Sequence, residues 1–381
     1  MTGREGNRPI CSDARSLAGA GTGVASYARA LRAAQLAIDP SARLLRGSPV
    51  AESGAAAKRI ARALLPGPVR VGGEFASPDL FRRAHLRFGV RRRLSPVIVP
   101  GPPGLIHWSY PVPLRLAGWR NLYTVHDAIP LLRPELTSID PRRHREVLAC
   151  IAASADRIVT VSEAARADII DALGCVPDLV VDCSQAVEVA DLGEGEPLAG
   201  LSSDGYLLFC GLVEPRKNIA RLLAAYRASG ATLPLVIAGP DGWRADRIAP
   251  LIAATPGVLR LPFLDRASLL RLMAGARALL FPSLAEGFGL PIAEAMALGI
   301  PVLAGATPAQ IETGGGAILS VDPEDGQAIA RGIAALCDDP GLRADLSLRG
   351  KIEARRFAPA RFAAGLGRLY DDVFAAPPRC R

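Results

Sequence analysis

The sequence predicts an α/β fold in which two Rossmann-like, doubly wound domains follow one another with a cleft between them. Its 381 residues exceed what one hydrophobic core usually organises. From Asp204 onward, short apolar runs alternate with helical stretches, as in a parallel sheet covered by helices. An acidic, glycine-rich stretch at 182–203 indicates a linker. We therefore expect domains at 1–185 and 200–355, and a C-terminal helix at 356–381 that packs back toward the first domain.

The second half of the chain has the more regular pattern. Apolar runs predict strands at 206–211, 233–239, 258–264, 278–283 and 300–305. Helical periodicity predicts helices at 218–229, 266–276 and 290–299, the last ending on Gly299. Beyond about Pro340 we expect further helix up to Phe374. This alternation predicts one doubly wound unit.

The first half is less periodic. Short apolar runs predict strands at 106–109, 121–127 and 156–162. A helix is expected at 163–174, because Ser162 is a good N-cap and Gly174 stands just past its end. Between Ser41 and Pro103 the composition turns to Arg, Pro, Gly and Ala without clear periodicity, so we assign no element there.

Composition restricts the class of protein. Half of the residues (50%) are hydrophobic, which excludes a disordered or fibrous chain. No apolar run reaches the ~18 residues of a membrane-spanning helix, and the start MTGREGNRPI lacks the apolar core of a signal peptide, so we expect a cytoplasmic protein. The 7 cysteines form no CxxC pair and the 4 histidines no HExxH motif, so we expect reduced thiols and no metal site.

Charge is distributed unevenly along the chain. Residues 1–185 hold 25 Lys and Arg against 16 Asp and Glu, a net +9, whereas residues 186–381 hold 20 against 21, a net −1. This asymmetry indicates an anionic partner that meets the first domain, such as a membrane surface or a phosphorylated lipid. We expect no nucleic-acid partner.

The segment SLAEGFGLPIAEAMALGIPVLAG (283–305) is the strongest candidate for a site. Glu286 follows a predicted strand and precedes a Gly-Phe-Gly turn that opens a helix, and Glu294 falls just over one turn into that helix. A helix N-terminus offers backbone N–H groups to phosphate or sugar oxygens, and carboxylates accept hydrogen bonds from vicinal hydroxyls. The alternative is an ordinary βα turn with two solvated glutamates.

A second candidate is FCGLVEPRKN (209–218), in which a strand and a glycine precede Arg216 and Lys217. Cations at the start of a helix oppose its dipole unless an anion binds there, and such local conflicts often mark function. Lys217 is also one of only 3 lysines in an arginine-rich chain. The alternative is that both side chains are ordinary surface charges.

The glycine-rich segment LAGAGTGVASYARAL (17–31) precedes a helical pattern. Its glycines, Gly19, Gly21 and Gly23, match neither GxGxxG nor a P-loop. Such a loop would still let the backbone approach a diphosphate. A plain glycine turn is the alternative.

Histidines end two predicted strands of the first half. In YTVHDAIPLLRPE (123–135), His126 and Asp127 stand at the carboxyl end of a strand, where ligands bind in such folds. For His107 the sequence leaves both a site role and a buried packing role open.

Together these segments resemble glycosyltransferase family 4, whose members are retaining enzymes of the GT-B fold. The segments TGVASYARAL, VHDAIPL, RIVTVSEAARADI, GLVEPRKN and PSLAEGFGLPIAEAMALGIPVLAG fall in the family's order over nearly the whole chain. HDAIPL and PSLAEGFGLP are most similar to a bacterial branch that uses GDP-mannose to build O-antigen or exopolysaccharide. The resemblance implies transfer of mannose from this nucleotide sugar to a saccharide acceptor linked to polyprenyl diphosphate, with no metal or other cofactor.

The resemblance also implies roles for individual side chains. Glu286 would contact hydroxyls of the donor sugar, and Glu294 would contact the ribose. Arg216 and Lys217 would neutralise the diphosphate as it leaves, and His126 would bind the sugar near its 6-hydroxyl and anomeric carbon.

Backbone positions complete the implied donor site. Phe288, Gly289 and Leu290 would bring the helix N-terminus to the diphosphate, and Gly23 would let the loop of the first domain approach it. In this fold, basic residues are expected to stand in for a divalent ion.

Three departures from the family pattern stand out. Pro262 replaces a glycine beside the expected base pocket, and Gln310 occupies the place of an acidic residue, with Glu312 two positions on. The usual end of the first domain is replaced by VVDCSQAVE.

Other functions share many of these features. UDP-glucose or another UDP-hexose would serve the same chemistry, and a nucleotide-sugar epimerase would share the fold. A sugar-binding protein of the periplasmic type would share the cleft, and an inactive paralogue would bind nucleotide without turnover.

Overall fold

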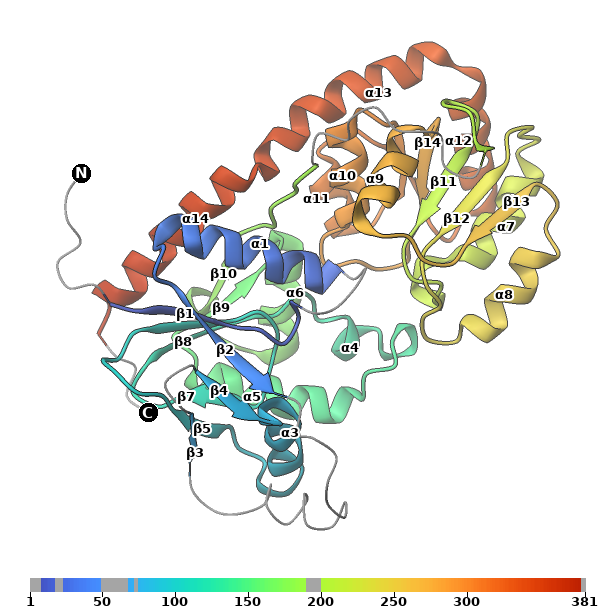
Figure 1. The fold of residues 1–381 in the computed structure, drawn as a ribbon. Helices are drawn as coiled ribbons and strands as arrows, with labels where there is room; N and C mark the ends of the chain where they lie inside the picture. The colour runs from blue at the N-terminus through green and yellow to red at the C-terminus, as the bar shows by residue number, and fades with distance from the viewer. Residues whose placement is uncertain (1–7, 18–22, 49–67, 72–74, 190–199, 378–381) are drawn as a thin grey trace.

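A computed structural model describes residues 8–17, 23–48, 68–71, 75–189 and 200–377. It contains two large parallel sheets, one in each half of the chain, both flanked by helices (Figure 1). The predicted class of two doubly wound α/β units is confirmed.

The first unit is built on a seven-stranded sheet. In sheet order its strands are β10 (Val180–Asp182), β9 (Arg157–Thr160), β8 (Arg120–Thr124), β6 (Leu105–Trp108), β1 (Ile10–Asp13), β2 (Arg43–Ser48) and β4 (Ala76–Pro78). A smaller parallel sheet contains β3 (Val69–Arg70), β5 (Ser95–Ile98) and β7 (Leu114–Leu116). The helices are α1 (Gly23–Ile38), α3 (Leu80–Arg91), α4 (Ile129–Leu132), α5 (Pro141–Ser154) and α6 (Glu163–Leu173).

The second unit is built on a six-stranded sheet. In sheet order its strands are β13 (Val258–Leu261), β12 (Leu235–Ala238), β11 (Leu207–Cys210), β14 (Ala278–Phe281), β15 (Val302–Gly305) and β16 (Leu319–Val321). The helices are α7 (Ile219–Ala228), α8 (Ala245–Ala253), α9 (Arg266–Ala274), α10 (Leu290–Leu298), α11 (Pro308–Gly314), α12 (Gly326–Asp338) and α13 (Pro340–Glu353). Strands β11, β12, β14 and β15 are buried along their whole length, which explains their continuous apolar sequences.

Each of the two large sheets has a point at which the strand order reverses, and such a point favours a binding site at the carboxyl ends of the strands. In the first sheet the order reverses between β1 and β6, and in the second it reverses between β11 and β14. Loops diverge at such a switch point and leave a crevice in which ligands bind. The loops that follow β6, β8, β11 and β14 all contribute residues to one cavity.

The last helix returns to the first unit. A short 3-10 turn, Ala354–Phe357, joins α13 to α14 (Pro359–Ala375), and Figure 1 shows the two helices running from the second unit to the first. The Tyr370 hydroxyl lies 2.9 Å from His107 Nδ1 and accepts a hydrogen bond from Gln35 Nε2 at 3.2 Å. His107 is fully buried, so the packing role is the one the structure supports.

Buried hydrogen bonds define the state of His107. Its Nε2 lies 2.9 Å from Thr124 Oγ1, which donates its own hydrogen to the Tyr27 hydroxyl. Nε2 therefore carries the ring hydrogen, and Nδ1 accepts from Tyr370. Burial lowers the pKa of His107 to about 3, so the ring is neutral.

Several local predictions are confirmed and others needed correction. Ser162 Oγ accepts a hydrogen bond from the Ala165 N–H, and Gly174 has a left-handed φ of 59°, as expected at the two ends of α6. The strand predicted at 121–127 spans Arg120–Thr124, and residues 125–127 belong to the loop that follows it. Strands β2 to β5 and helix α3 fall within the stretch left unassigned, and strands of two to six residues are too short to show a clear period. Part of the predicted linker, 190–199, lies outside the described residues.

Candidate active site

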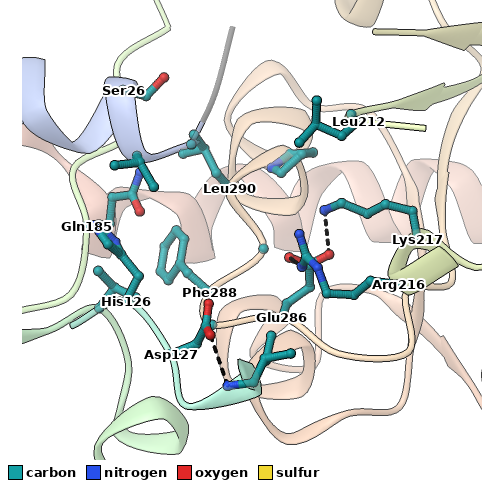
Figure 2. A pocket seen from close by; sticks show the side chains of 18 of the residues that line it. Ser26, His126, Asp127, Gln185, Leu212, Arg216, Lys217, Glu286, Phe288 and Leu290 are labelled. Atoms are coloured by element: carbon teal, nitrogen blue, oxygen red, sulfur yellow. Dashed lines mark hydrogen bonds and ion pairs between the residues drawn. The ribbon is translucent and has the colours of Figure 1, made fainter. Parts of the chain in front are cut away.

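A cavity of about 690 Å³ lies between the two units, at the carboxyl ends of their strands. Figure 2 shows side chains from both units converging on it. The nine residues that the resemblance implies for the donor site all line this cavity: Gly23, His126, Arg216, Lys217, Glu286, Phe288, Gly289, Leu290 and Glu294. The sequence therefore located the residues of one site, while their individual roles stay predictions.

Glu286 holds two of the cationic side chains that line the cavity, Arg216 and Lys217. Its carboxylate accepts hydrogen bonds from Lys217 Nζ at 2.6 Å and from Arg216 Nη1 at 2.7 Å (Figure 2). Arg216 also donates to Glu214 Oε1 at 2.8 Å. Only 8% of the Lys217 side chain and 9% of the Glu286 side chain are exposed, so both belong to a buried ionic network and are not solvated surface charges.

Burial alone would raise the pKa of Glu286, but Arg216 and Lys217 outweigh this effect and bring it down to about 2. Burial lowers the pKa of Lys217, and the charge of Glu286 opposes that change. The paired carboxylate is therefore ionised at neutral pH and keeps both cations directed at the cavity.

The prediction that Arg216 and Lys217 stand at the start of a helix was wrong. Arg216 and Lys217 do not open α7 but occupy a separate 3-10 turn, Pro215–Lys217. Asn218, with a left-handed φ of 60°, separates that turn from the helix. The cations are balanced by carboxylates and do not simply oppose a helix dipole.

Glu294 has a different partner. It lies in α10, with 3% of its side chain exposed, and accepts a hydrogen bond from Arg266 Nη1 at 2.6 Å. Burial raises the pKa of Glu294, while Arg266 lowers it. Arg266 also donates to the carbonyl of Glu188, in the segment that joins the two units.

The N-terminus of α10 faces the cavity. Gly289 precedes the helix with a left-handed φ of 98°, and Leu290 and Pro291 begin it. The Phe288 carbonyl accepts a hydrogen bond from Thr313 Oγ1 at 2.6 Å, which fixes the turn. This turn presents the positive end of the helix to an anion in the cavity.

His126 lies on the wall formed by the first unit. One of its ring nitrogens, Nε2, lies 3.0 Å from the Ser109 carbonyl, and a carbonyl only accepts, so Nε2 carries the hydrogen. Burial lowers the pKa of His126 to about 4. The neutral ring is held edge-on by Tyr27, with 4.9 Å between ring centroids. Nδ1 is thereby left as a hydrogen-bond acceptor.

Gly23 begins α1 at the edge of the cavity. A Cβ atom at this position would meet none of the described atoms within 4 Å, so packing among the described residues gives no reason for glycine. The expected close approach to a diphosphate stays a prediction, and Gly19 and Gly21 lie outside the described residues.

Direct contacts between the units frame the cavity. Ser162 Oγ donates to the Gly287 carbonyl at 2.6 Å. Glu312, on α11, accepts hydrogen bonds from the backbone N–H groups of Glu163 at 2.9 Å and Ala164 at 2.8 Å. A carboxylate from the second unit therefore caps the N-terminus of α6 in the first.

The two departures near α11 have structural explanations. Gln310 is fully buried and donates to the Ser283 carbonyl at 2.8 Å and to Thr307 Oγ1 at 2.9 Å. Its Oε1 accepts from the Gly305 N–H at 3.1 Å, so this amide braces the loops behind the cavity. Glu312 instead forms the contact with the N-terminus of α6 that joins the two units.

Several cavity residues were not selected from the sequence. Gln185, Arg266 and Tyr110 line the cavity but belong to no local motif. Asp127 was noted beside His126, and its carboxylate accepts from the Ile129 N–H at 3.0 Å. Only the adjacent histidine signalled Asp127, and tertiary contacts alone place the others.

The described residues contain neither a candidate metal site nor a candidate membrane-spanning helix. No group of three His, Cys, Asp or Glu side chains within them is arranged to hold a metal ion. None of the helices they form is both long enough and apolar enough to span a bilayer.

Comparison with known sequences covers most of the chain. Residues 17–181 match the family model described as Glycosyltransferase Family 4, and residues 200–352 match the one described as Glycosyl transferases group 1. The chain is 34% identical over 254 residues to O-antigen chain mannosyltransferase B of Escherichia coli, covering 63% of this chain and 67% of that protein. It is 31% identical over 214 residues to the serotype-specific mannosyltransferase WbdA of Escherichia coli, covering 50% of this chain but only 26% of that longer protein.

Solved structures share the fold. Sucrose-phosphate synthase from Thermosynechococcus elongatus aligns over 97% of this chain and 100% of its own, with a TM-score of 0.72 and 20% identity. Anabaena HepE in complex with UDP and glucose aligns over 96% of this chain and 100% of its own, with a TM-score of 0.69 and 18% identity. The two units are thus arranged as in the GT-B fold, and the chain belongs to the family 4, or group 1, glycosyltransferases.

Proposed function

We propose that the protein transfers mannose from GDP-mannose to a saccharide acceptor with retention of configuration. The observation that carries this proposal is the ionic network of Arg216, Lys217 and Glu286 beside the N-terminus of α10, in a cavity between two units. Cleavage of a glycosyl diphosphate needs stabilisation of the charge that develops on the leaving group. The relatives named as mannosyltransferases favour mannose as the transferred sugar.

In the proposed reaction, the bond between the anomeric carbon and the diphosphate oxygen breaks on the face where the acceptor hydroxyl attacks. The acceptor oxygen bonds to the anomeric carbon, and its proton passes to the departing diphosphate. Lys217, Arg216 and the N–H groups at the start of α10 stabilise that diphosphate, so no divalent ion is required. Glu286 contacts sugar hydroxyls, and Glu294 contacts the ribose, without a covalent intermediate.

The direct test is transfer by the purified protein, measured with GDP-mannose and a polyprenyl-diphosphate-linked saccharide in the presence of EDTA. We expect mannosylated product with the anomeric configuration of the donor. Absence of transfer with every nucleotide sugar tested would refute the proposal, and inhibition by EDTA would refute metal independence.

A UDP-hexose is the second candidate donor, because the similar HepE structure contains UDP and glucose. Thermal-shift measurements with GDP and UDP separate the two donors, since a bound ligand stabilises by RT ln(1 + [L]/Kd). Consumption of donor without any acceptor would instead indicate an epimerase.

We also propose that the first unit meets an anionic, lipid-linked acceptor at the inner membrane face. Exposed arginines on α3 and α5 support this, namely Arg82, Arg142, Arg143 and Arg145. Residues 137–144 connect that surface to the cavity, which Thr137, Ile139 and His144 line. Co-sedimentation should show binding to phosphatidylglycerol vesicles and none to phosphatidylcholine vesicles, and equal binding to both would contradict the idea.

A further inference from the structure

Gln185 combines burial, a place on the cavity wall and an unpaired donor. The residue lines the cavity, and only 4% of its surface is exposed. Its Nε2 is buried and has no hydrogen-bond partner in the part of the chain that the structure describes. An unpaired buried amide costs stability, so a residue kept in this state calls for an explanation.

The backbone around Gln185 is fixed. Ser184, just before it, has a left-handed φ of 59°, which is uncommon for a residue with a side chain. The Ser184 N–H donates to Asp182 Oδ1 at 2.7 Å, and the Val187 N–H donates to the Phe357 carbonyl at 2.9 Å. The segment is therefore anchored on both sides of Gln185, in the region VVDCSQAVE that departs from the family pattern.

Another buried glutamine beside the cavity shows what a purely structural amide looks like. Gln310 uses both ends of its amide in three hydrogen bonds to neighbouring groups. Gln185 lacks such partners at Nε2, although it is nearly as buried. A half-turn of its planar amide exchanges Oε1 and Nε2 at almost no steric cost, so either end can face the cavity.

The surroundings indicate what would pair with this amide. Gln185 lies on the same side of the cavity as His126, across from Arg216 and Lys217 (Figure 2). The cations opposite suit a diphosphate, whereas the wall with Gln185 offers an amide donor and the acceptor Nδ1 of a neutral histidine. A hydroxyl group both donates and accepts, so it matches this pair, and a phosphate does not.

We propose that Gln185 is a specificity-determining residue that binds a hydroxyl group of the transferred sugar. This inference rests on the proposed function, because it requires a nucleotide sugar in the cavity. It assigns to the segment between the units a direct part in recognising the sugar, in addition to joining the units.

The test compares binding of a nucleotide sugar with binding of the nucleotide alone, by calorimetry on the full chain. Gln185→Met removes the amide and keeps a similar volume. We expect it to weaken binding of GDP-mannose about tenfold and to change binding of GDP less than twofold. Gln35→Met is the matched control, because Gln35 is a buried glutamine with an unpaired Oε1 but does not line the cavity. The control should lower the melting temperature and leave both affinities unchanged.

Two further measurements identify the bound group. One of the donors that each lack a single sugar hydroxyl should bind the wild type about tenfold more weakly than GDP-mannose does. The same donor should bind Gln185→Met no more weakly than GDP-mannose does. Gln185→Glu should retain binding of GDP, because a carboxylate at the sugar lies away from the diphosphate. If Gln185 instead faced the diphosphate, the new carboxylate would repel the phosphate groups and binding of GDP would be lost.

Equal loss of GDP and GDP-mannose binding in Gln185→Met, or an unchanged pattern with the deoxy donors, would overturn the inference and leave the proposed function standing. If wild type binds no nucleotide sugar, with UDP-glucose included among the ligands tested, both the inference and the proposed function fail.

Discussion

Lys217 Nζ donates a hydrogen bond to Glu286 Oε1 at 2.6 Å, and this contact joins the loop after β11 to the loop after β14. The two strands are neighbours on either side of the point where the strand order reverses. The switch point of the second sheet is therefore bridged by a buried ion pair that faces the first unit.

Lys217→Ala should abolish most of the transfer activity without unfolding the protein. The change removes a cation assigned to the leaving diphosphate, and such groups typically contribute about 100-fold or more to kcat. Glu286 retains Arg216 as a partner, so the melting temperature should change little. Initial rates and thermal unfolding of both this variant and Lys351→Ala, an exposed lysine on α13, provide the check. Turnover within a few-fold of wild type would refute the assignment of Lys217.

Glu286→Gln should destabilise the protein at neutral pH by about 3–5 kcal/mol, because buried Lys217 loses its carboxylate partner and Arg216 keeps only Glu214. The pKa of Glu286 falls from an ordinary 4.5 to about 2 on folding, so its contribution is complete above pH 4.5 and declines as the pH falls toward 2. Urea unfolding should give a constant difference between wild type and variant at pH 7 and 5, and a smaller one at pH 4. A difference that grows on acidification would contradict the pairing. Exposed Glu324→Gln is the control.

Arg266→Met should make nucleotide binding sensitive to pH. Burial raises the pKa of Glu294 and Arg266 opposes this, so removing Arg266 moves that pKa further upward. In the proposed function the ionised carboxylate of Glu294 accepts hydrogen bonds from the ribose hydroxyls, so nucleotide binding should be lost as the pH falls through the pKa of Glu294. We expect the Kd for GDP to rise about tenfold at pH 7 and to recover toward the wild-type value at pH 9. Arg271→Met, on the exposed side of the same helix, should show neither effect. A loss independent of pH would show that Arg266 acts in another way.

Gly287→Ala should separate the two units. A Cβ atom at Gly287 would lie 2.3 Å from the His126 carbonyl oxygen, which is backbone and has little room to move. Displacement of about 1 Å at a reacting centre costs roughly 100-fold in rate, so transfer should fall to that extent. X-ray scattering should show a larger radius of gyration with unchanged secondary structure. Gly89→Ala meets free space and should behave as wild type. An active, compact Gly287→Ala protein would contradict the close contact.

Tyr370→Phe should cost about 1–3 kcal/mol of stability. The change leaves His107 Nδ1 without its donor and Gln35 Nε2 without one acceptor, both inside the core. Because the Tyr27 ring at the other end of the same network packs on His126, transfer should also slow. Urea unfolding with parallel rate measurements would reveal both effects, and an unchanged midpoint would show that the network contributes nothing to stability.

The sequence identified residues that sit in local strand, turn and helix patterns and left out those placed by distant contacts. Glu286, Glu294, Arg216 and Lys217 were found because each follows a buried strand within one short segment, and parallel strands bring their carboxyl ends together. Arg266 and Gln185 reach the same cavity only through packing of the units, which no spacing within their own segments reveals. Strands of two to six residues between β2 and β5 were likewise too short to show a period.

Helix α14 has a consequence for the order in which the molecule forms. Gln35 and Tyr370 are 335 positions apart, yet each satisfies the other in the core of the first unit. During synthesis, the face of α1 that carries Gln35 stays uncovered until residues 359–375, which form α14, have left the ribosome. By then β11 to β16 and their helices are already available. We therefore expect the unit made second to become native first, with the earlier unit held as an incomplete intermediate that α14 closes.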